Sequence, residues 1–318
     1  MKAECGGVGV WECGSEIPPY AHTPILPYFP EEVAVNLCGA RMLADNARDA
    51  GYAVPAFNTN GATYEITRAA VEAAEELRSP MILQTYEPNI AFRGFEYFVL
   101  QAKHLAKNAS VPIALHLDHG MSLESAKQAV EAGYTSIMID CSHLPLEENI
   151  RVTREVIAAV RPLGVSVEAE VGHVAGGVHS HGEVAGCTNP DDAVRLVEET
   201  GVDMLAIANG TEHGIFVIQD RIDLDLVREL RAKVSVPLVQ HGTCGIPLAL
   251  ISALAKSGMA KINFGENFRS NYITYFVDFA ETLDHSGHPW KIAQAVKDRL
   301  KDDMKTLIRA LGSDGKAL

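Results

Sequence analysis

Three histidines each follow a short apolar run, although they lie far apart in the chain. His119 follows VPIALHLD, His213 follows MLAIANGTE, and His241 ends PLVQH. Neutral imidazoles from three separate loops leave one position of a tetrahedral metal open, as a catalytic zinc requires, whereas a structural zinc has four ligands that are usually rich in cysteine. Any one histidine could simply satisfy a loop hydrogen bond, but three at equivalent points favour a metal site.

An aspartate accompanies the first of these histidines. Asp118 directly precedes His119, and neighbouring side chains of an extended segment point to opposite faces, so Asp118 is not an obvious co-ligand. We interpret it as an acid/base group beside the metal. The alternative role, a cap for the following helix, is already served by Ser122.

Short runs rich in Val and Ile alternate with amphipathic stretches of ten to fifteen residues from Gly39 onward, which is the pattern of alternating strands and helices. We expect strands at 53–58, 80–85, 112–118, 135–140, 166–170, 204–209, 237–241 and 260–263. We expect helices near 63–78, 96–108, 122–132, 147–161, 190–200, 223–233 and 247–257, with a long helical tail from about 266. Without a GxGxxG turn after the first strand, the pattern predicts an α/β fold of the closed (β/α)8 TIM-barrel type.

Chemistry in such a barrel lies at the C-terminal ends of the strands, where the βα loops meet. Barrel interiors normally hold Val, Ile and Leu, yet most of these ends are polar. The polar residues there are Asn58, Gln84, Tyr86, Asp118, His119, Asp140, Ser142, His143, Glu168, Glu170, Asn209, His241 and Asn263. So many polar side chains at equivalent positions indicate one site.

A long Gly-rich segment, residues 168–190, follows the fifth strand. Loops of this length in compact barrels are usually functional lids or disordered segments. We interpret His173, His179 and His181 as lid residues rather than further zinc ligands. Glu183 is a candidate catalytic acid/base that a closing lid would deliver.

Composition limits the remaining possibilities. The 318 residues carry 41 acidic and 27 basic side chains, a net charge of −14, which disfavours nucleic-acid binding, and no apolar window is long enough for a membrane span. Six scattered cysteines without a CxxC pair, and a start that does not resemble a signal peptide, predict a cytoplasmic protein. Five prolines within residues 1–36 predict an irregular arm before a single domain over 37–318, a barrel that ends in a C-terminal helical extension.

Apolar stripes in the C-terminal helices need burial, either within the chain or in a homo-oligomer, a dimer or tetramer, to which the proline-rich arm could also contribute. The stripe residues are Ile292, Ala295, Val296, Leu300, Met304, Leu307, Ile308 and Leu311.

The chain resembles the class II, zinc-dependent ketose-bisphosphate aldolases, especially the fructose- and tagatose-bisphosphate branch. The similarity runs from about residue 40 to 285 and rests, in order, on AFNTN, EAAEELRSPMILQ, VPIALHLDHG, GYTSIMIDCSHLPLEENI, VEAEVGHVAGG, NGTEHGIF, PLVQHGTCGIP and KINFGENFR.

The resemblance implies a reversible retro-aldol cleavage of a small sugar or sugar phosphate, with Zn²⁺ as cofactor. It implies that the three histidines bind zinc and that Asp118 handles the proton on the C4 hydroxyl or aldehyde oxygen. It also implies an accessory pair for a monovalent or second divalent cation (Asp140 and Glu170) and a contact to the donor carbonyl region (Asn263). Backbone amides of Gly214 and Gly242 would face the phosphate of dihydroxyacetone phosphate, and we expect Asn58 to be a further substrate-binding residue.

Two departures affect the phosphate region. Relatives usually have a serine after the seventh strand, where this chain has Thr243 and Cys244, and commonly a threonine where it has Glu266. A glutamate beside a phosphate sets like charges close together. We therefore expect either a rearranged loop or an unphosphorylated donor such as dihydroxyacetone, with Cys244 and Glu266 as substrate contacts.

Two other readings use the same residues. One is another zinc-dependent barrel enzyme, such as a hydrolase that uses metal-bound hydroxide. The other is a non-catalytic aldolase-like subunit, although neither Asp118 nor any of the three histidines is lost.

Overall fold

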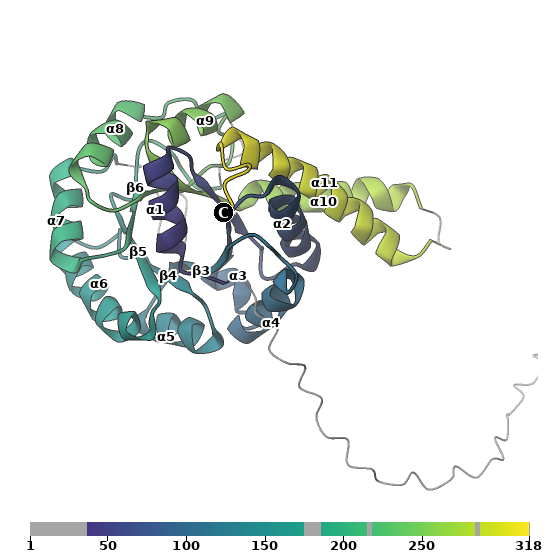
Figure 1. The fold of residues 1–318 in the computed structure, drawn as a ribbon, viewed down its shortest axis with the longest axis horizontal. Coiled ribbons are helices and arrows are strands. Elements are labelled where there is room, and N and C mark those ends of the chain that lie inside the picture. The colour runs from purple at the N-terminus through teal and green to yellow at the C-terminus, as the bar shows by residue number, and fades with distance from the viewer. Residues whose placement is uncertain (1–36, 175–185, 215–217, 284–286, 318) are drawn as a thin grey trace, which may run out of the picture. The chain divides into compact units, whose positions relative to one another are not determined.

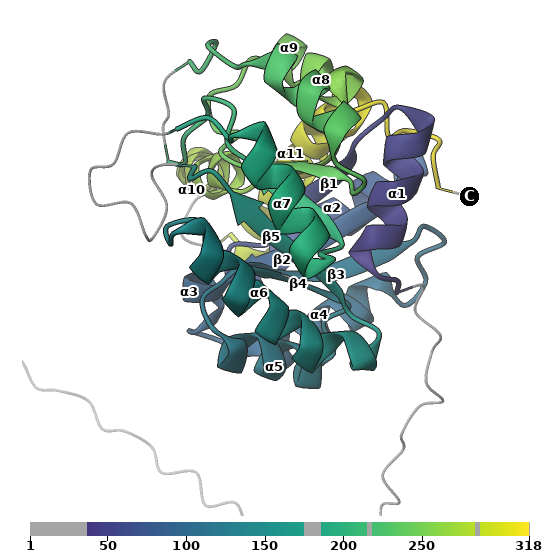
Figure 2. The same ribbon diagram turned by 90° about the vertical axis from the view of Figure 1, so that its left-hand side faces the viewer.

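Eight parallel strands close into a barrel. The computed structural model describes residues 37–174, 186–214, 218–283 and 287–317. Within them β1 to β8 pair in sequence order and β8 pairs back with β1, with helices around the outside (Figures 1 and 2). The predicted TIM barrel is confirmed. The arm expected over residues 1–36 lies outside the described residues.

All eight predicted strands are present, with small differences at their ends. Their bounds are β1 (Val54–Asn58), β2 (Met81–Tyr86), β3 (Ile113–Gly120), β4 (Ser136–Ile139), β5 (Ser166–Val171), β6 (Met204–Ile207), β7 (Leu238–Gln240) and β8 (Met259–Phe264). Most of their residues are buried on both faces, as expected of parallel strands covered by helices.

The helices also follow the predicted rhythm. They are α1 (Ala40–Ala50), α2 (Tyr64–Leu77), α3 (Glu87–Ile90), α4 (Phe95–Ala106), α5 (Leu123–Ala132), α6 (Leu146–Val160), α7 (Pro190–Thr200), α8 (Leu224–Lys233), α9 (Leu248–Ser257), α10 (Glu266–Glu281) and α11 (Pro289–Ala310). The predicted helical tail from about residue 266 is present and consists of two helices, α10 and α11. Pro289 lies at the first position of α11, where a proline suits a helix start but not a helix interior.

Helix α1, which the sequence analysis did not predict, closes the N-terminal end of the barrel. Its buried residues Leu43, Ala44 and Ala47 pack with the apolar side chains of the barrel interior. Arg41 at its start forms an ion pair with Asp203, just before β6. Because apolar side chains fill that end of the barrel, the C-terminal ends of the strands are where the polar side chains of a site can gather.

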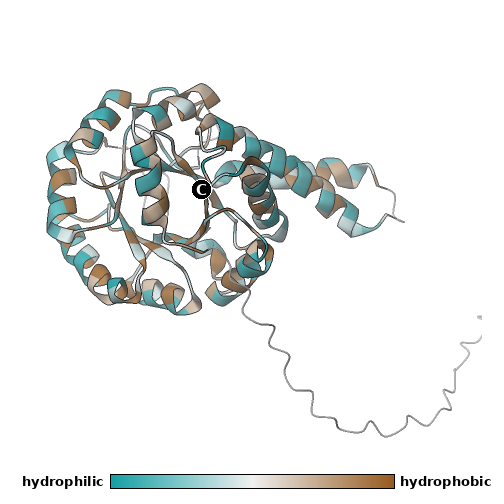
Figure 3. Ribbon diagram, in the orientation of Figure 1, coloured by the Kyte–Doolittle hydropathy of each residue, from teal (hydrophilic) through white to brown (hydrophobic). Residues whose placement is uncertain are grey.

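Helix α11 packs against α2 and α10. Its predicted apolar stripe is largely buried within the chain, because Val296, Leu300, Met304 and Ile308 are all buried. Figure 3 shows hydrophobic residues on the strands and on the inner faces of the helices around the barrel. Among the described helices, none has both the length and the apolar character needed to cross a membrane.

The packing of α11 on α2 includes an ion pair whose contribution to the stability of the fold should depend on pH. Lys297, which is largely buried, donates to Glu72. Burial raises the pKa of Glu72, but hydrogen bonds from Lys297 and Arg68 outweigh it and hold that pKa below its usual value. A lowered carboxyl pKa stabilises the fold above about pH 4.5, and this contribution is lost as the pH falls through the folded-state pKa.

We therefore expect Glu72→Gln to lower the free energy of unfolding by roughly 1 kcal/mol at pH 7, since Glu72 is partly exposed to solvent. The difference from the wild type should shrink at pH 3, where the carboxyl is protonated. Urea unfolding at both pH values measures it. An equal difference at pH 7 and pH 3 would contradict the role of this ion pair.

Candidate active site

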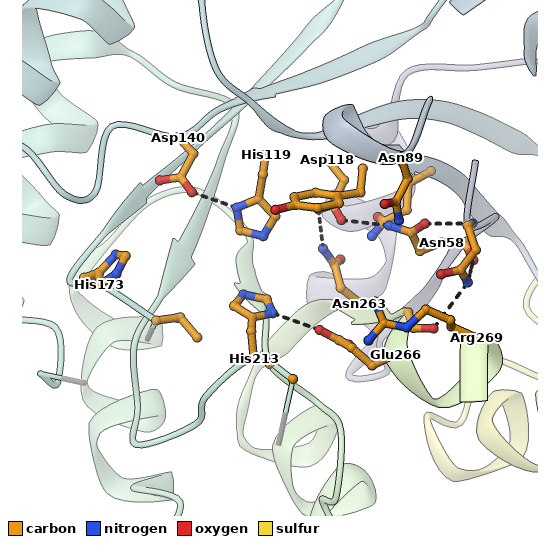
Figure 4. A pocket seen from close by; sticks show the side chains of 17 residues that line it. Asn58, Asn89, Asp118, His119, Asp140, His173, His213, Asn263, Glu266 and Arg269 are labelled. Atoms are coloured by element: carbon orange, nitrogen blue, oxygen red, sulfur yellow. Dashed lines mark hydrogen bonds and ion pairs between the residues drawn. The ribbon is translucent and has the colours of Figure 1, made fainter. Parts of the chain in front are cut away.

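A pocket of about 360 Å³ opens at the C-terminal ends of the strands. Most of the residues that line it are polar, and they include nine of the thirteen residues predicted for the site together with residues that were not predicted (Figure 4). The nine are Asn58, Asp118, His119, Asp140, His213, Gly214, Gly242, Asn263 and Glu266. Two more predicted residues, Glu170 and His241, are buried and adjoin the lining residue His119.

The three predicted histidines converge. One ring nitrogen of each lies within 4.8 Å of the others, and the shortest distance, 2.9 Å, joins Nε2 of His119 to Nδ1 of His241. Nε2 of His213 is buried and has no hydrogen-bond partner among the described residues. These three nitrogens are donors to which a metal ion could bind.

Each of the three histidines has a carboxylate on its other ring nitrogen. Such carboxylate partners fix the tautomer and the ring orientation of metal-binding histidines. The pairs are His119 Nδ1 with Asp140 Oδ2 (2.7 Å), His213 Nδ1 with Glu266 Oε1 (3.4 Å) and His241 Nε2 with Glu168 Oε1 (3.0 Å). The lone pairs of the remaining nitrogens are thereby free to face a common point.

The end of β3 is irregular, and this irregularity positions two site residues. His119 has a backbone φ of +49°, a left-handed conformation that is uncommon for residues other than glycine, and the register with β4 shifts between Leu117 and Gly120. A regular extended segment, as expected from the sequence, would direct these two side chains to opposite faces. Because the strand is distorted here, Asp118 and His119 both line the pocket.

Asp118 lines the same pocket as His119 and His213 but belongs to neither group of residues that could hold a metal. Its two carboxylate oxygens accept hydrogen bonds from amides on different strands: Asn58 Nδ2 donates to Oδ2 (3.1 Å) and Asn263 Nδ2 donates to Oδ1 (3.0 Å). The carboxylate is therefore held in one orientation from two sides.

A second group of metal-binding type comprises His119, Asp140 and Glu170. Burial and the neighbouring charge of Asp140 raise the pKa of Glu170 to about 8. The pKa of Asp140 is held far below its usual value, against the effect of burial, by the hydrogen bond from His119. Burial opposes protonation of His119, but Asp118 and Asp140 raise its pKa to about 10. The negative charges of Asp118 and Asp140 near His119 therefore favour the binding of a cation at this point.

Glu266, the first residue of α10, lies beside His213 on the pocket wall (Figure 4). Burial would raise its pKa, but the interactions with His213 lower it to about 2, so the carboxylate is charged at neutral pH. Gly214 and Gly242, both with positive φ, line the same pocket. A Cβ at position 242 would lie 3.0 Å from the backbone of Glu212, which excludes larger residues there.

Besides the buried Glu170 and His241, two predicted site residues are not part of the lining that the structure describes. Cys244 is buried and directs its sulfur to Oδ1 of Asn267 (3.1 Å), away from the pocket lining. Glu183 lies outside the described residues, as do His179 and His181. His173 does line the pocket, on the side of Asp140 (Figure 4).

Several residues of the pocket were not predicted from the sequence, chiefly Asn60, Asn89 and Arg269. They lie beyond the strand ends, on loops and helices where periodicity gives no signal. The partner of Glu168, the buried Lys261, was not predicted either. A lysine within the apolar run AKIN was a signal for that pair.

Comparison with protein families matches residues 39–316 to the family described as "Fructose-bisphosphate aldolase class-II". The chain belongs to this family. A fructose-bisphosphate aldolase of Geobacillus stearothermophilus is 37% identical over 290 residues, which cover 89% of this chain and 99% of the relative. A fructose-bisphosphate aldolase of Staphylococcus epidermidis is 36% identical over 285 residues, which cover 87% of this chain and 97% of the relative. Among solved structures, the YdjI aldolase from Escherichia coli K12 superposes with a TM-score of 0.78 at 33% identity, over 89% of this chain and 100% of that one.

The protein is therefore a class II aldolase, an enzyme of retro-aldol cleavage, as the resemblance of its motifs predicted. Family membership gives no support to the hydrolase or to the non-catalytic subunit. The groups expected for such chemistry, a cluster of histidines and an adjacent carboxylate, are those that the pocket brings together.

Proposed function

We propose that this aldolase is zinc-dependent and that His119, His213 and His241 hold the zinc. The observation that carries the proposal is the carboxylate on the far nitrogen of every one of these rings. Three imidazoles with a fourth position left for substrate are the ligand set of a catalytic zinc. The residues present therefore fit the metal that the family implies, and Asp140 with Glu170 would hold an additional monovalent or divalent cation.

When bound, zinc supplies a Lewis acid that stabilises the negative charge developing on the donor half of the ketose. Asp118 would take the proton from the C4 hydroxyl as the carbon–carbon bond breaks and return it to the aldehyde oxygen in the reverse direction. Asn58 and Asn263 orient Asp118 for this transfer. Glu183 stays a predicted second acid/base group.

Two buried amide oxygens in the pocket are suited to bind a polyhydroxylated substrate. Gln84 Oε1 and Asn263 Oδ1 have no hydrogen-bond partner among the described residues, and both side chains line the pocket. Buried acceptors without a partner are unfavourable unless a ligand or water donates to them. Hydroxyl groups of a sugar or sugar phosphate would do so.

We also propose that the donor half carries no phosphate, so that the product is dihydroxyacetone. Glu266 supports this proposal because its carboxylate is charged and lies in the same pocket as Gly214 and Gly242, the glycines matched to the phosphate position. Arg269 favours the alternative, since it lines the same pocket and its positive charge lowers the pKa of Glu266. Relatives named fructose-bisphosphate aldolases also favour the phosphorylated donor.

Cleavage of ketose pairs that differ only in the phosphate at C1 tests the donor. Separate coupling enzymes for dihydroxyacetone and dihydroxyacetone phosphate identify the product, with zinc-loaded and chelator-treated protein compared. We expect zinc-dependent release of dihydroxyacetone, and expect Glu266→Gln to shift kcat/KM towards 1-phosphorylated ketoses by about tenfold or more, as removal of a like charge predicts.

Glu266→Gln keeps an oxygen that can accept from His213, and its zinc affinity serves as the control for indirect effects on the metal. Equal or better use of 1-phosphorylated ketoses by the wild type would contradict the unphosphorylated donor while leaving the aldolase class intact.

Replacement of Asp118 tests its role in proton transfer. We expect Asp118→Asn to lower kcat by about 10²- to 10⁴-fold, because a positioned acid/base group contributes that much. Zinc content should stay unchanged, since Asp118 is not a ligand in this proposal. Steady-state kinetics and metal analysis of the same preparation measure both. Loss of zinc in parallel with activity would show instead that Asp118 binds the metal.

We further propose that the chain forms a homo-oligomer through α10. Of its residues only Phe268 is buried, while Ile273, Phe276 and Val277 are 59%, 43% and 48% exposed and occupy one face. Figure 3 shows hydrophobic residues on the part of α10 and α11 that extends beyond the barrel. A twofold axis would place this face of one subunit against the same face of a second copy.

The four described cysteines are free thiols, which suits the predicted cytoplasmic location.

Light scattering after size exclusion tests this face. The wild type should elute as a multiple of 34.3 kDa, and Phe276→Asp should shift it towards the monomer because a charge would be buried in the contact. Leu163→Asp, at a position 64% exposed on the barrel, is the matched control and should leave the mass unchanged. A monomeric wild type would contradict the proposal.

A further inference from the structure

A buried charge cluster lies inside the barrel, one layer below the pocket. Glu168 on β5 and Lys261 on β8 are both fully buried, and Lys261 Nζ donates to Glu168 Oε2 over 2.8 Å. His116 on β3 is also fully buried, with its Nε2 3.7 Å from the same oxygen. The proposed function assigns no task to Lys261, and Glu168 enters it only through its contact with Nε2 of His241.

Such a pair is costly in a barrel interior. Removing two charges from water costs several kcal/mol per ion, and replacing a buried ion pair by apolar residues is often neutral or stabilising. The neighbouring interior positions of this barrel are apolar, among them Met138, Met204 and Val239. Stability alone therefore does not explain a lysine and a glutamate here, and the groups that they contact become informative.

Glu168 connects the cluster to the metal-binding histidines. Its Oε2 accepts from Lys261, and its Oε1 lies 3.0 Å from Nε2 of His241. An ionised carboxylate can only accept, so the hydrogen of this imidazole must be on Nε2. Nδ1 of His241 is then without a hydrogen and faces Nε2 of His119 at 2.9 Å.

A competing donor lies at the same nitrogen. Nδ2 of Asn263 is 3.2 Å from Nε2 of His241, and the orientation of this amide is fixed because it also donates to Asp118 over 3.0 Å. Without an acceptor at position 168, Nε2 of His241 would accept from Asn263 and the hydrogen would move to Nδ1. Nδ1 could then no longer bind a metal.

We propose that Glu168, held in place by Lys261, is a positioning residue that selects the tautomer of His241 in which Nδ1 can bind zinc. This inference rests on the proposed function, in which His241 is a zinc ligand. It makes the buried ion pair a part of the metal site rather than of the hydrophobic core.

The single variant Glu168→Gln should impair zinc binding. Lys261 can only donate, so the new amide would turn its oxygen to Lys261 and its NH2 group to His241, which favours the wrong tautomer. We expect zinc affinity to fall by about 10- to 100-fold, the usual cost of losing such a partner. Competition with a chromophoric chelator measures the affinity, and the visible absorption of the Co²⁺-loaded protein reports the ligand set.

Two double variants separate this role from charge balance and packing. Glu168→Gln/Lys261→Met and Glu168→Met/Lys261→Met both remove the buried charges, and glutamine and methionine have similar shapes. Only the first leaves an acceptor for Nε2 of His241. We expect the first to bind zinc within about tenfold of the wild type, and the second to bind about 10- to 100-fold more weakly with an altered Co²⁺ spectrum.

Thermal unfolding of the metal-free proteins verifies that the variants fold. If Glu168→Gln alone does not fold because Lys261 lacks a partner, the two double variants still show whether zinc binding depends on an acceptor for Nε2 of His241. Equal zinc affinities of the two double variants, with an unchanged Co²⁺ spectrum, would overturn the inference. A wild type that binds no zinc would overturn the proposed function, and this inference with it, so the two failures are distinguishable.

Discussion

A close contact between an imidazole nitrogen and a carboxylate oxygen occurs three times in this site, and the rest of the site depends on it. Asp140 and Glu168 form hydrogen bonds with His119 and His241, and Glu266 lies 3.4 Å from Nδ1 of His213. Such contacts fix which ring nitrogen keeps its lone pair and where the ring points. Three such rings, delivered by loops of different strands, can then share one metal position.

The barrel brings the partners of these contacts together. Parallel strands bring residues distant in sequence to one end of the sheet, while α1 closes the opposite end with apolar side chains. The distorted end of β3 turns Asp118 and His119 into the same pocket. Backbone strain at His119 is thus tied to the proposed function, since a regular strand would separate Asp118, the proposed acid/base group, from the histidines proposed to hold zinc.

Much of this arrangement could be predicted from the sequence, for identifiable reasons. The eight strands were predictable because buried parallel strands are short apolar runs, and their polar last residues marked the site. Helix α1 was missed because no strand precedes it to establish the rhythm. Arg269 and Asn89 were missed because their contribution depends on how loops and helices fold over the barrel, which periodicity does not encode. The partner of each histidine depends on side-chain geometry, so only the structure pairs Glu266 with His213.

X-ray absorption at the zinc edge of the zinc-loaded protein tests the central claim most directly. The account predicts three imidazole nitrogens at about 2.0–2.1 Å, with oxygen ligands completing the shell. A sulfur ligand at about 2.3 Å, or a shell of oxygen ligands without imidazole, would contradict it.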